Sequence, residues 1–464
     1  MFTKKSFESV SIALFLALLL LGSGTSTFAQ SKNDKKKAKA FIVQGDKAFR
    51  LKNFREAADA YGQAVALVPN DSYGHYWKAN AHYSLKEYDE ADREFTLALN
   101  QGFKRVEVYK VRWYLYYDQK NYDAALMDIR KGLELEPKNM ALLLGLADIL
   151  YQQRSFPEAL SAFQNALLLT PKDGDIFYYI ARVHTAMGNV ADQGTSADEA
   201  IKKNTKYVGE AYYLLADSLD RQKDLGAAIT AYEKAIAAKP DNYQAYRNLS
   251  NIYQRQNRMT NAIEVSRKAL VLFPSDGGLY TDLSWYYSLA DRPSDAVAAA
   301  QSATKFLPNE YMGYTNLCRA LNDTKQYAQA IISCNNALKL NPKDGETNFY
   351  LGRAHDFLKR TAEATRFYKL AVAGLIDFTA NNPEYSDGFY LLGNAYFADN
   401  QRDKAIEAFR RCLELSPSFS KARSNLGTIL VLQKNKAGAM EQYNYLLAQD
   451  PALAAKLKVE IDKL

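Results

Sequence analysis

The sequence predicts an all-α fold, a solenoid of about twelve helix-turn-helix repeats followed by a C-terminal capping helix. Two observations predict it. Ten of the twelve prolines keep a 34-residue period, as in the run Pro240, Pro274, Pro308 and Pro342. Alanine fills one place in eleven of twelve successive periods. A fixed period of this size is typical of stacked units, none of which can bury its apolar face alone.

The segment 241–274 shows how one repeat is built. Tyr246, Leu249 and Tyr253 recur at three- and four-residue steps, which places them on one face of a first helix. A polar stretch interrupts this pattern, which then resumes on a second helix. Pro274 ends the repeat, because proline has no amide hydrogen with which to continue a helix.

Four parts are expected along the chain. They are a signal peptide (1–29), a basic leader (30–37), twelve repeats (38–451) and a capping helix (452–464). The repeats run approximately over 36–69, 70–103, 104–137, 138–171, 172–205, 206–240, 241–274, 275–308, 309–342, 343–383, 384–417 and 418–451.

The first 29 residues have the order of a secretory signal peptide. Lys4 and Lys5 precede the apolar run 12–21, and small residues follow before Gln30. The run is short for a membrane span, which needs about 20 residues. We therefore expect an exported chain, periplasmic or secreted, with no stable membrane insertion of its mature form. An uncleaved N-terminal anchor is the alternative.

The net charge of +7 comes mostly from residues 1–39. The repeats are close to neutral, so a nucleic-acid partner is not expected. The lysine-rich segment 32–39 is interpreted as a solvated leader to the first helix, with contact to lipid headgroups as the alternative.

Small and aromatic residues recur at fixed places in each repeat. Alanine occupies position 20, glycine often occupies position 8, and an aromatic residue often occupies position 24. The position-20 alanines are Ala57, Ala91, Ala125, Ala159, Ala228, Ala262, Ala296, Ala330, Ala364, Ala405 and Ala439. This pattern closely resembles the tetratricopeptide repeat over about residues 38–451. The resemblance implies a right-handed solenoid whose first helices line a concave groove for protein or peptide segments.

Three repeats depart from the pattern, and the sixth does so only by being one residue late. In the fifth, Gln193 replaces the position-20 alanine and Thr205 replaces the proline, which indicates either simple drift or a flexible joint. The tenth carries seven extra residues before Pro383, so we expect its second helix to be about two turns longer.

Cys318 and Cys334 occupy positions 8 and 24 of one repeat, which face each other in a hairpin of the resembling family. In an oxidising compartment this arrangement predicts a disulfide. Two small buried thiols are the alternative. Cys412, at position 27, is expected to be a buried free thiol.

Catalytic chemistry is not expected. The four histidines have no metal-site spacing, and three of them, His82, His184 and His355, share a core position. Phosphate-binding loops, nucleophile elbows and zinc-protease motifs are absent from the sequence. We therefore expect no enzyme activity and no cofactor.

The resemblance places positions 2, 5, 9 and 12 in the groove. The candidate binding residues at these positions are Phe49, Tyr76, Tyr83, Tyr117, Tyr151, Tyr178, Tyr213, Arg247, Asn251, Arg319 and Arg353. The aromatic ones either bind a partner or only seal the joints between stacked first helices.

Arg247 and Asn251 match two places of the clamp with which related co-chaperones grip a terminal carboxylate, but Asp282 and Met312 interrupt the rest. That ligand is therefore not predicted. Arg319 and Arg353 either hold an acidic side chain or are solvated surface arginines.

The leading hypothesis is an exported scaffold that binds protein segments in an aromatic-rich groove, in cell-envelope assembly or secretion. A periplasmic chaperone for transient clients and a glycan-binding solenoid are the alternatives. The identity of the partner cannot be predicted from these residues.

Overall fold

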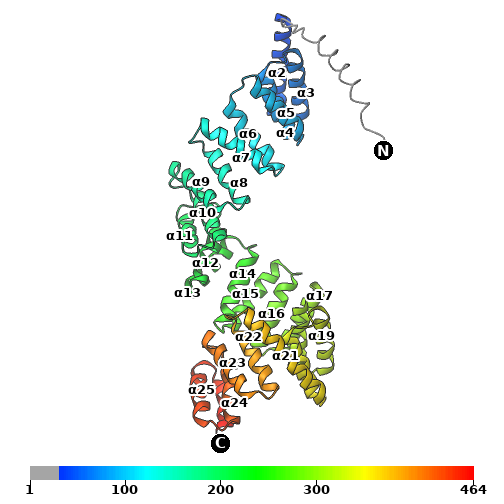
Figure 1. Cartoon of the computed structure of the whole chain (residues 1–464), viewed down its shortest axis with the longest axis vertical. Coiled ribbons are helices and arrows are strands. Elements are labelled where there is room, and N and C mark those ends of the chain that lie inside the picture. Colours follow the sequence, from blue (N-terminus) through cyan, green and yellow to red (C-terminus); the bar gives the residue numbers. More distant parts are fainter. Residues whose placement is uncertain (1–30) are drawn as a thin grey trace, which may run out of the picture. The chain divides into compact units, whose positions relative to one another are not determined.

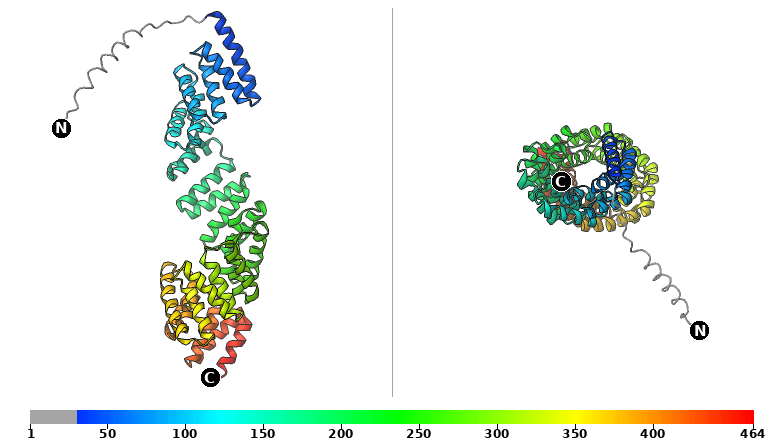
Figure 2. Two further views of the ribbon diagram at one scale, coloured as in Figure 1. Left: turned by 90° about the vertical axis from the view of Figure 1, so that its right-hand side faces the viewer. Right: turned by 90° about the horizontal axis from the view of Figure 1, so that it is seen from above.

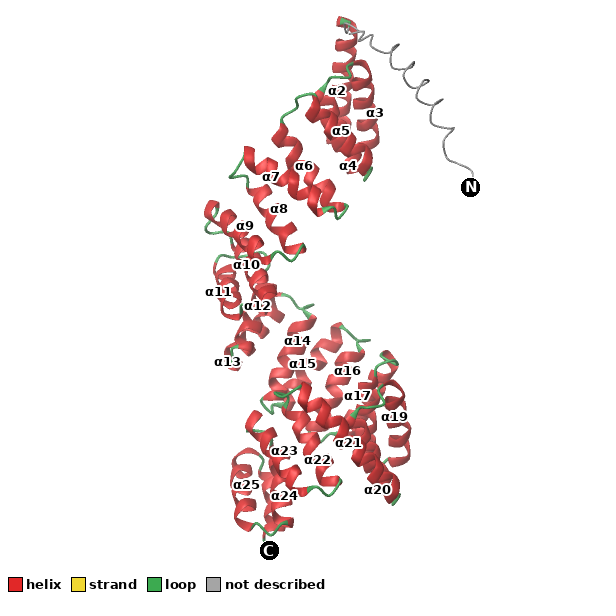
Figure 3. Cartoon of the chain, viewed as in Figure 1, coloured by secondary structure: helices red, strands yellow, loops and turns green. Residues whose placement is uncertain are grey.

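The computed structural model describes residues 31–464, and helix is the regular secondary structure of that range (Figure 3). The expected signal peptide lies outside the described residues. The chain forms two compact parts, divided between Met187 and Gly188. We call described residues 31–187 the N-terminal body and residues 188–464 the C-terminal body. The division falls at the turn of the fifth repeat, between its two helices.

The N-terminal body stacks four helical hairpins and one further helix (Figure 1). Its helices are α2 (Lys32–Arg50), α3 (Phe54–Leu67), α4 (Ser72–Ser84), α5 (Tyr88–Asn100), α6 (Arg105–Asp118), α7 (Tyr122–Leu135), α8 (Met140–Gln152), α9 (Phe156–Leu169) and α10 (Gly174–Met187).

The C-terminal body begins with the second helix of the fifth repeat and ends with the capping helix. Its helices are α11 (Val190–Lys202), α12 (Val208–Arg221), α13 (Leu225–Ala238), α14 (Tyr243–Arg255), α15 (Met259–Leu272), α16 (Gly277–Leu289), α17 (Pro293–Phe306), α18 (Tyr311–Asp323), α19 (Tyr327–Leu340), α20 (Gly345–Phe357), α21 (Thr361–Asn381), α22 (Ser386–Ala398), α23 (Arg402–Leu415), α24 (Ser420–Leu432), α25 (Lys436–Gln449) and α26 (Pro451–Ile461).

The lysine-rich segment corrects one expectation, because it is not a leader but the start of α2. Ser31 caps this helix, accepting a hydrogen bond on Oγ from the amide of Asp34 at 3.0 Å. Lysine and alanine are good helix formers, so the segment continues the helix while its side chains remain largely in solvent.

Small residues let the two helices of each hairpin approach closely. The eleven position-20 alanines are at most 2 % exposed. At position 8, a Cβ on Gly352 would lie 2.8 Å from the Tyr368 ring, and one on Gly45 would lie 2.7 Å from the Tyr61 ring. Glycine at position 8 therefore makes room for the aromatic ring at position 24.

Each repeat turns at a residue in the left-handed region. Eleven of these residues are not glycine, with φ between 57° and 68°: Lys52, Lys86, Lys120, Arg154, Lys223, Asn257, Asp291, Lys325, Lys359, Asn400 and Lys434. In each case the following amide reaches back five residues to close the first helix, as Arg360 N donates to His355 O at 2.9 Å. The fifth repeat has Gly188 at this place, with φ of 77°.

The prolines end the second helices by acting on the residue before them. In all ten cases that residue is the C-cap, with φ between −152° and −123°. Proline disfavours helical geometry at the preceding residue. Where the proline is missing, Gly102 and Asn204 take the left-handed region and end the helix instead.

Gln193 explains how the fifth repeat tolerates a large residue at position 20. Its side chain is fully buried and points to the next first helix, α12. There the amide nitrogen donates to Leu214 O at 2.8 Å and to Asp217 Oδ2 at 2.9 Å. The glutamine thus replaces apolar contact with hydrogen bonds between two repeats.

The insertion in the tenth repeat lengthens its second helix, as predicted. α21 has 21 residues, where most second helices have 14. A Cβ on Gly374 would lie 2.4 Å from Lys343 O, and one on Gly345 would lie 2.6 Å from Leu375 N. Because the two helices are antiparallel, the residues of α21 after Leu375 run past the start of α20.

Candidate functional site

The C-terminal body encloses a cavity of about 390 Å³ on the side of its first helices. The first helices α14, α16, α18 and α20 supply one wall. The end of α21 and the start of α22 supply the other.

The second wall comes from the insertion. Phe378 and Asn381 line the cavity from the extra turns of α21, and Asn382 and Tyr385 follow in the loop before α22. The Phe378 and Tyr385 rings meet edge to face, with centroids 5.8 Å apart. A repeat of ordinary length would lack this wall.

Two hydrogen bonds join repeats of the C-terminal body that are distant in sequence. Gln254 Nε2 on α14 donates to Asp387 Oδ2 on α22 at 3.3 Å. Lys421 Nζ on α24 donates to Ser288 O on α16 at 2.9 Å. Each pair is 133 residues apart, so the C-terminal body curves (Figure 2) until the C-terminal ends of α14 and α16 meet the N-terminal ends of α22 and α24.

Arg319 lies in the first wall and is only 3 % exposed. Its guanidinium stacks 4.1 Å from the Trp285 ring centroid. The two terminal nitrogens donate to Glu346 Oε1 and to Asn316 Oδ1, both at 2.7 Å. Asn316 in turn donates to Thr281 O at 2.9 Å, so this arginine ties α16, α18 and α20 together.

Carboxyl groups dominate the ionisable side chains of the cavity. Burial raises the pKa of Glu346 to about 7 and that of Asp387 to about 6. Burial also raises the pKa of Asp282 and Asp344. These four groups are held in surroundings that solvate a negative charge poorly, and all are therefore easier to protonate than free carboxyl groups.

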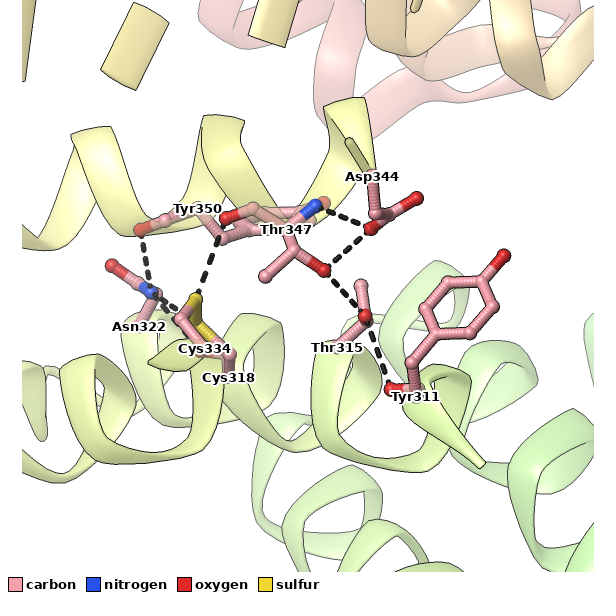
Figure 4. Close-up of a disulfide and its surroundings, with 8 residues drawn as sticks. All are labelled: Tyr311, Thr315, Cys318, Asn322, Cys334, Asp344, Thr347 and Tyr350. Carbon is pink, nitrogen blue, oxygen red and sulfur yellow. Dashed lines mark hydrogen bonds between the residues drawn. A yellow bond between two sulfur atoms is a disulfide. The ribbon is translucent and has the colours of Figure 1, made fainter. Parts of the chain in front are cut away.

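A disulfide lies behind the first wall. Cys318 on α18 and Cys334 on α19 are joined, with Cα atoms 5.2 Å apart, so the structure contains the predicted pair (Figure 4). Beside it, Asn322 Nδ2 donates to Tyr350 O at 3.1 Å and links α18 to α20. Cys412 is a buried free cysteine, and burial raises the pKa of its thiol.

The same close-up shows how the disulfide side connects to the cavity. Asp344 Oδ2 accepts from the amide of Thr347 at 2.8 Å and caps α20. The Thr347 hydroxyl also bonds to Asp344 and lies 2.6 Å from the Thr315 hydroxyl. Thr315 and Asp344 both line the cavity. These hydrogen bonds therefore connect the cavity residues Thr315 and Asp344 to the hairpin of α18 and α19, which the disulfide joins.

The predicted aromatic residues of the N-terminal body contact neighbouring first helices. The Phe49 ring lies 5.1 Å from that of Trp77 on α4, and Tyr83 donates to Asp118 on α6 at 3.0 Å. Arg182 on α10 lies 5.0 Å from the Tyr151 ring.

Tyr117 also contacts a neighbouring first helix, because its hydroxyl lies beside Asp148 of α8. Burial, and then this carboxylate, raise the pKa of Tyr117 to about 12. Tyr76 is buried and stacks on Phe103 at 4.3 Å, and Tyr178 is also buried. These contacts favour the alternative in which the rings seal joints between repeats.

The predicted residues of the C-terminal body divide into two groups. Asn251 and Arg319 line the cavity. Arg247, Arg353 and Tyr213 do not. Arg247 pairs with Asp282 at 2.9 Å and Arg353 with Asp323 at 2.8 Å, while Tyr213 lies 5.9 Å from the Tyr232 ring.

Arg319 is therefore neither a solvated surface arginine nor free for an acidic ligand. It lies at position 9 of its repeat, one of the expected groove positions. Its partner Glu346 comes from the next repeat, at groove position 2, and was not among the candidate residues. The cavity residues that were missed include Glu346, Phe378, Tyr385 and Asp387. The one signal that pointed to the last three was the insertion before Pro383.

Within residues 31–464, no group of three or more His, Cys, Asp or Glu side chains is arranged to hold a metal ion. His75, which the sequence left unassigned, pairs with Glu94 at 2.6 Å in the N-terminal body. None of the helices described here is both long and apolar enough to cross a bilayer.

Comparison with known proteins identifies the family to which these repeats belong. A family model described as "Tetratricopeptide repeat" matches residues 42–99, 114–175, 144–208, 213–277 and 390–454, and a second of the same description matches 313–344.

Two curated relatives are similar over short stretches. The "Hsp70-Hsp90 organising protein" of Plasmodium falciparum is 32% identical over 106 residues, 21% of this chain and 19% of that protein. The "Small glutamine-rich tetratricopeptide repeat-containing protein 2" of Saccharomyces cerevisiae is 32% identical over 107 residues, 23% of this chain and 30% of that protein. The chain thus spans less than a third of either relative.

Among solved structures, that of an "APC/C hetero-tetramer Cut9-Hcn1" covers 92% of this chain and 96% of its own. It has 12% sequence identity and a TM-score of 0.41.

Proposed function

Because the chain belongs to the tetratricopeptide repeat family, whose repeats form protein-interaction scaffolds, we propose that it is an exported scaffold with one principal binding site. The site is the cavity of the C-terminal body, and its occupant is a segment of a partner protein.

The observation that carries this proposal is the cavity itself. It lies on the first-helix side, and its lining combines aromatic and apolar side chains with many polar and charged ones. A cavity of this size is typical of ligand sites. By contrast, the aromatic residues of the N-terminal body already contact their neighbours.

The proposal of export rests on the order of residues 1–29. Mass spectrometry of the protein purified from its native cells tests it. We expect a mature chain that begins at Gln30 and is recovered outside the cytoplasm. A chain that starts at Met1 in the cytoplasmic fraction would refute export and leave the binding site unaffected.

Photo-crosslinking in cells tests the binding site. A photo-reactive residue at Met312, which lines the cavity and is 52 % exposed, should trap a discrete partner. The matched control is Ile332, which is 63 % exposed on the second helix α19 and does not line the cavity. A partner trapped from Ile332 but not from Met312 would show that the binding face is elsewhere.

A further inference from the structure

We propose that the cavity of the C-terminal body receives a positively charged side chain, arginine or lysine, from the partner segment. This inference rests on the proposed function and adds the chemistry of the occupant. It is the opposite of a site for a terminal carboxylate.

The charges on the cavity wall favour a cation. Five carboxylate residues and two basic residues line the cavity: Asp282, Asp344, Glu346, Asp377 and Asp387 against Arg319 and Lys343. Two of these carboxylates already have cationic partners, since Arg247 pairs with Asp282 and Arg319 pairs with Glu346. When these two pairs are left out of the count, the cavity lining still has three carboxylates, Asp344, Asp377 and Asp387, but only one basic residue, Lys343. A cationic side chain would restore the balance of charge in a site where unpaired charge is costly.

Asp387 is a buried carboxylate with one unpaired oxygen. Its side chain is 3 % exposed and lines the cavity. Oδ2 accepts a long hydrogen bond from Gln254, but Oδ1 has no partner among the described residues. A buried carboxylate oxygen without a donor costs free energy, and a guanidinium or ammonium group supplies that donor.

Aromatic side chains surround the same space. Tyr311, Phe378 and Tyr385 line the cavity together with Trp285. Arg319 already shows that a guanidinium is accommodated here, because it lies 4.1 Å from the Trp285 ring centroid. A second cation entering between the walls would find further ring faces and edges together with Asp387.

An acidic occupant fits less well. Arg319 Nε also lacks a partner, but the charge of this guanidinium is balanced by Glu346, and Asn316 occupies another of its donors. An incoming carboxylate would meet Asp377 and Asp387 with only Lys343 to offset them. Like charges at such close quarters are unfavourable.

Selection from a random library of 12-residue peptides tests the chemistry without assuming a sequence. Immobilised full-length protein is the bait, and peptides are kept if a photo-reactive residue at Met312 crosslinks to them. We expect arginine or lysine to be enriched at one fixed place in the selected peptides. Enrichment of acidic or wholly apolar peptides would overturn this inference but not the proposed function. No peptide that crosslinks at Met312 would overturn both.

A double-mutant cycle then tests the role of Asp387. Replacing the enriched arginine or lysine by glutamine should weaken binding to the wild-type protein at least tenfold, as expected for a charge-assisted pair. The same change should have little effect on binding to Asp387→Asn. Equal losses for both proteins would show that the cation does not contact Asp387.

The matched control is Asp403→Asn. Asp403 on α23 also accepts a hydrogen bond from a glutamine, Gln433, but lies outside the cavity. This variant should bind the selected peptides as the wild type does. Circular dichroism of each variant verifies that it is folded. Only folded variants are used in the double-mutant cycle that tests whether the cation contacts Asp387.

Discussion

Asp387→Asn should make the stability of the C-terminal body less dependent on pH. Asp387 is almost fully buried, and burial raises its pKa from 3.8 to about 6. In the folded state the carboxyl group thus holds its proton up to a higher pH than it does in the unfolded chain. Asparagine is similar in shape and stays neutral at every pH of interest.

The sign follows from where the protons are bound. Between about pH 4 and pH 6 the folded state binds more protons at this site than the unfolded state, so stability falls as pH rises through this window. A shift of about two units corresponds to roughly 3 kcal/mol, since one unit is about 1.4 kcal/mol. Relative to wild type, Asp387→Asn should therefore gain up to about 3 kcal/mol between pH 4 and pH 8.

The neighbours of Asp387 set the size of this effect. Besides the amide of Gln254, the titratable or charged groups that face it are Arg319 on α18, Glu346 on α20, Tyr286 on α16, Cys412 on α23 and Tyr385 in the preceding loop. Arg319 is attractive and lowers the pKa, while Glu346 is repulsive once ionised. Because Glu346 titrates near neutral pH, Glu346→Gln should show the same sign, at higher pH.

Chemical denaturation at pH 4 and at pH 8 measures this difference, with Asp403→Asn as the control. Hydrogen exchange of α20 to α22 shows whether the gain is local. We expect wild type and Asp387→Asn to be within about 0.5 kcal/mol at pH 4 and to separate at pH 8. The same free-energy difference at both pH values would refute the assignment of a raised pKa to Asp387.

Three further perturbations test the repeat architecture. Replacing both Cys318 and Cys334 by serine should cost about 3 kcal/mol by the loop-entropy relation, and mass spectrometry without reductant should find both free thiols missing in the wild type. Lys359→Gly should stabilise the chain by about 0.5–1 kcal/mol, because glycine adopts the left-handed turn at lower cost, whereas Lys359→Val should destabilise it in the same denaturation assay. Ala91→Leu should overpack the hairpin of α4 and α5 and cost about 1–3 kcal/mol, with loss of hydrogen-exchange protection confined mainly to α4 to α7; uniform loss along the chain would contradict this.

Much of the fold could be predicted because it depends on local, periodic signals. The prolines end second helices through the residue before each of them, and the alanines mark where two helices of one hairpin touch. Both signals repeat every 34 residues, so each occurrence supports the others. The left-handed turns escaped prediction because lysine, arginine, asparagine and aspartate fill them in place of glycine. Backbone hydrogen bonds hold these turns in place, and because the side chains take no part in these bonds, no particular residue type marks the turn.

The site was harder to predict because its residues come from distant repeats. Arg319 occupies a predicted groove position, yet its burial depends on Glu346 and Trp285 from the repeats on either side. Asp387 is buried because Gln254, 133 residues earlier, meets it. No periodicity of the sequence reports that the stack curves enough for this contact. The insertion in α21 could be predicted as helix, but its position against the first helices could not.

The contacts between α14 and α22 and between α16 and α24 also bear on how the C-terminal body responds to mechanical force. A solenoid in which only neighbouring repeats touch lengthens gradually when its ends are pulled, because each joint opens by a small angle. Here Gln254 is bonded to Asp387 and Lys421 to Ser288, so the three repeats between the members of each pair cannot open until that bond breaks. Under tension this segment should first resist and then yield in one step. The cavity would be lost in that step, and any bound segment would be released with it.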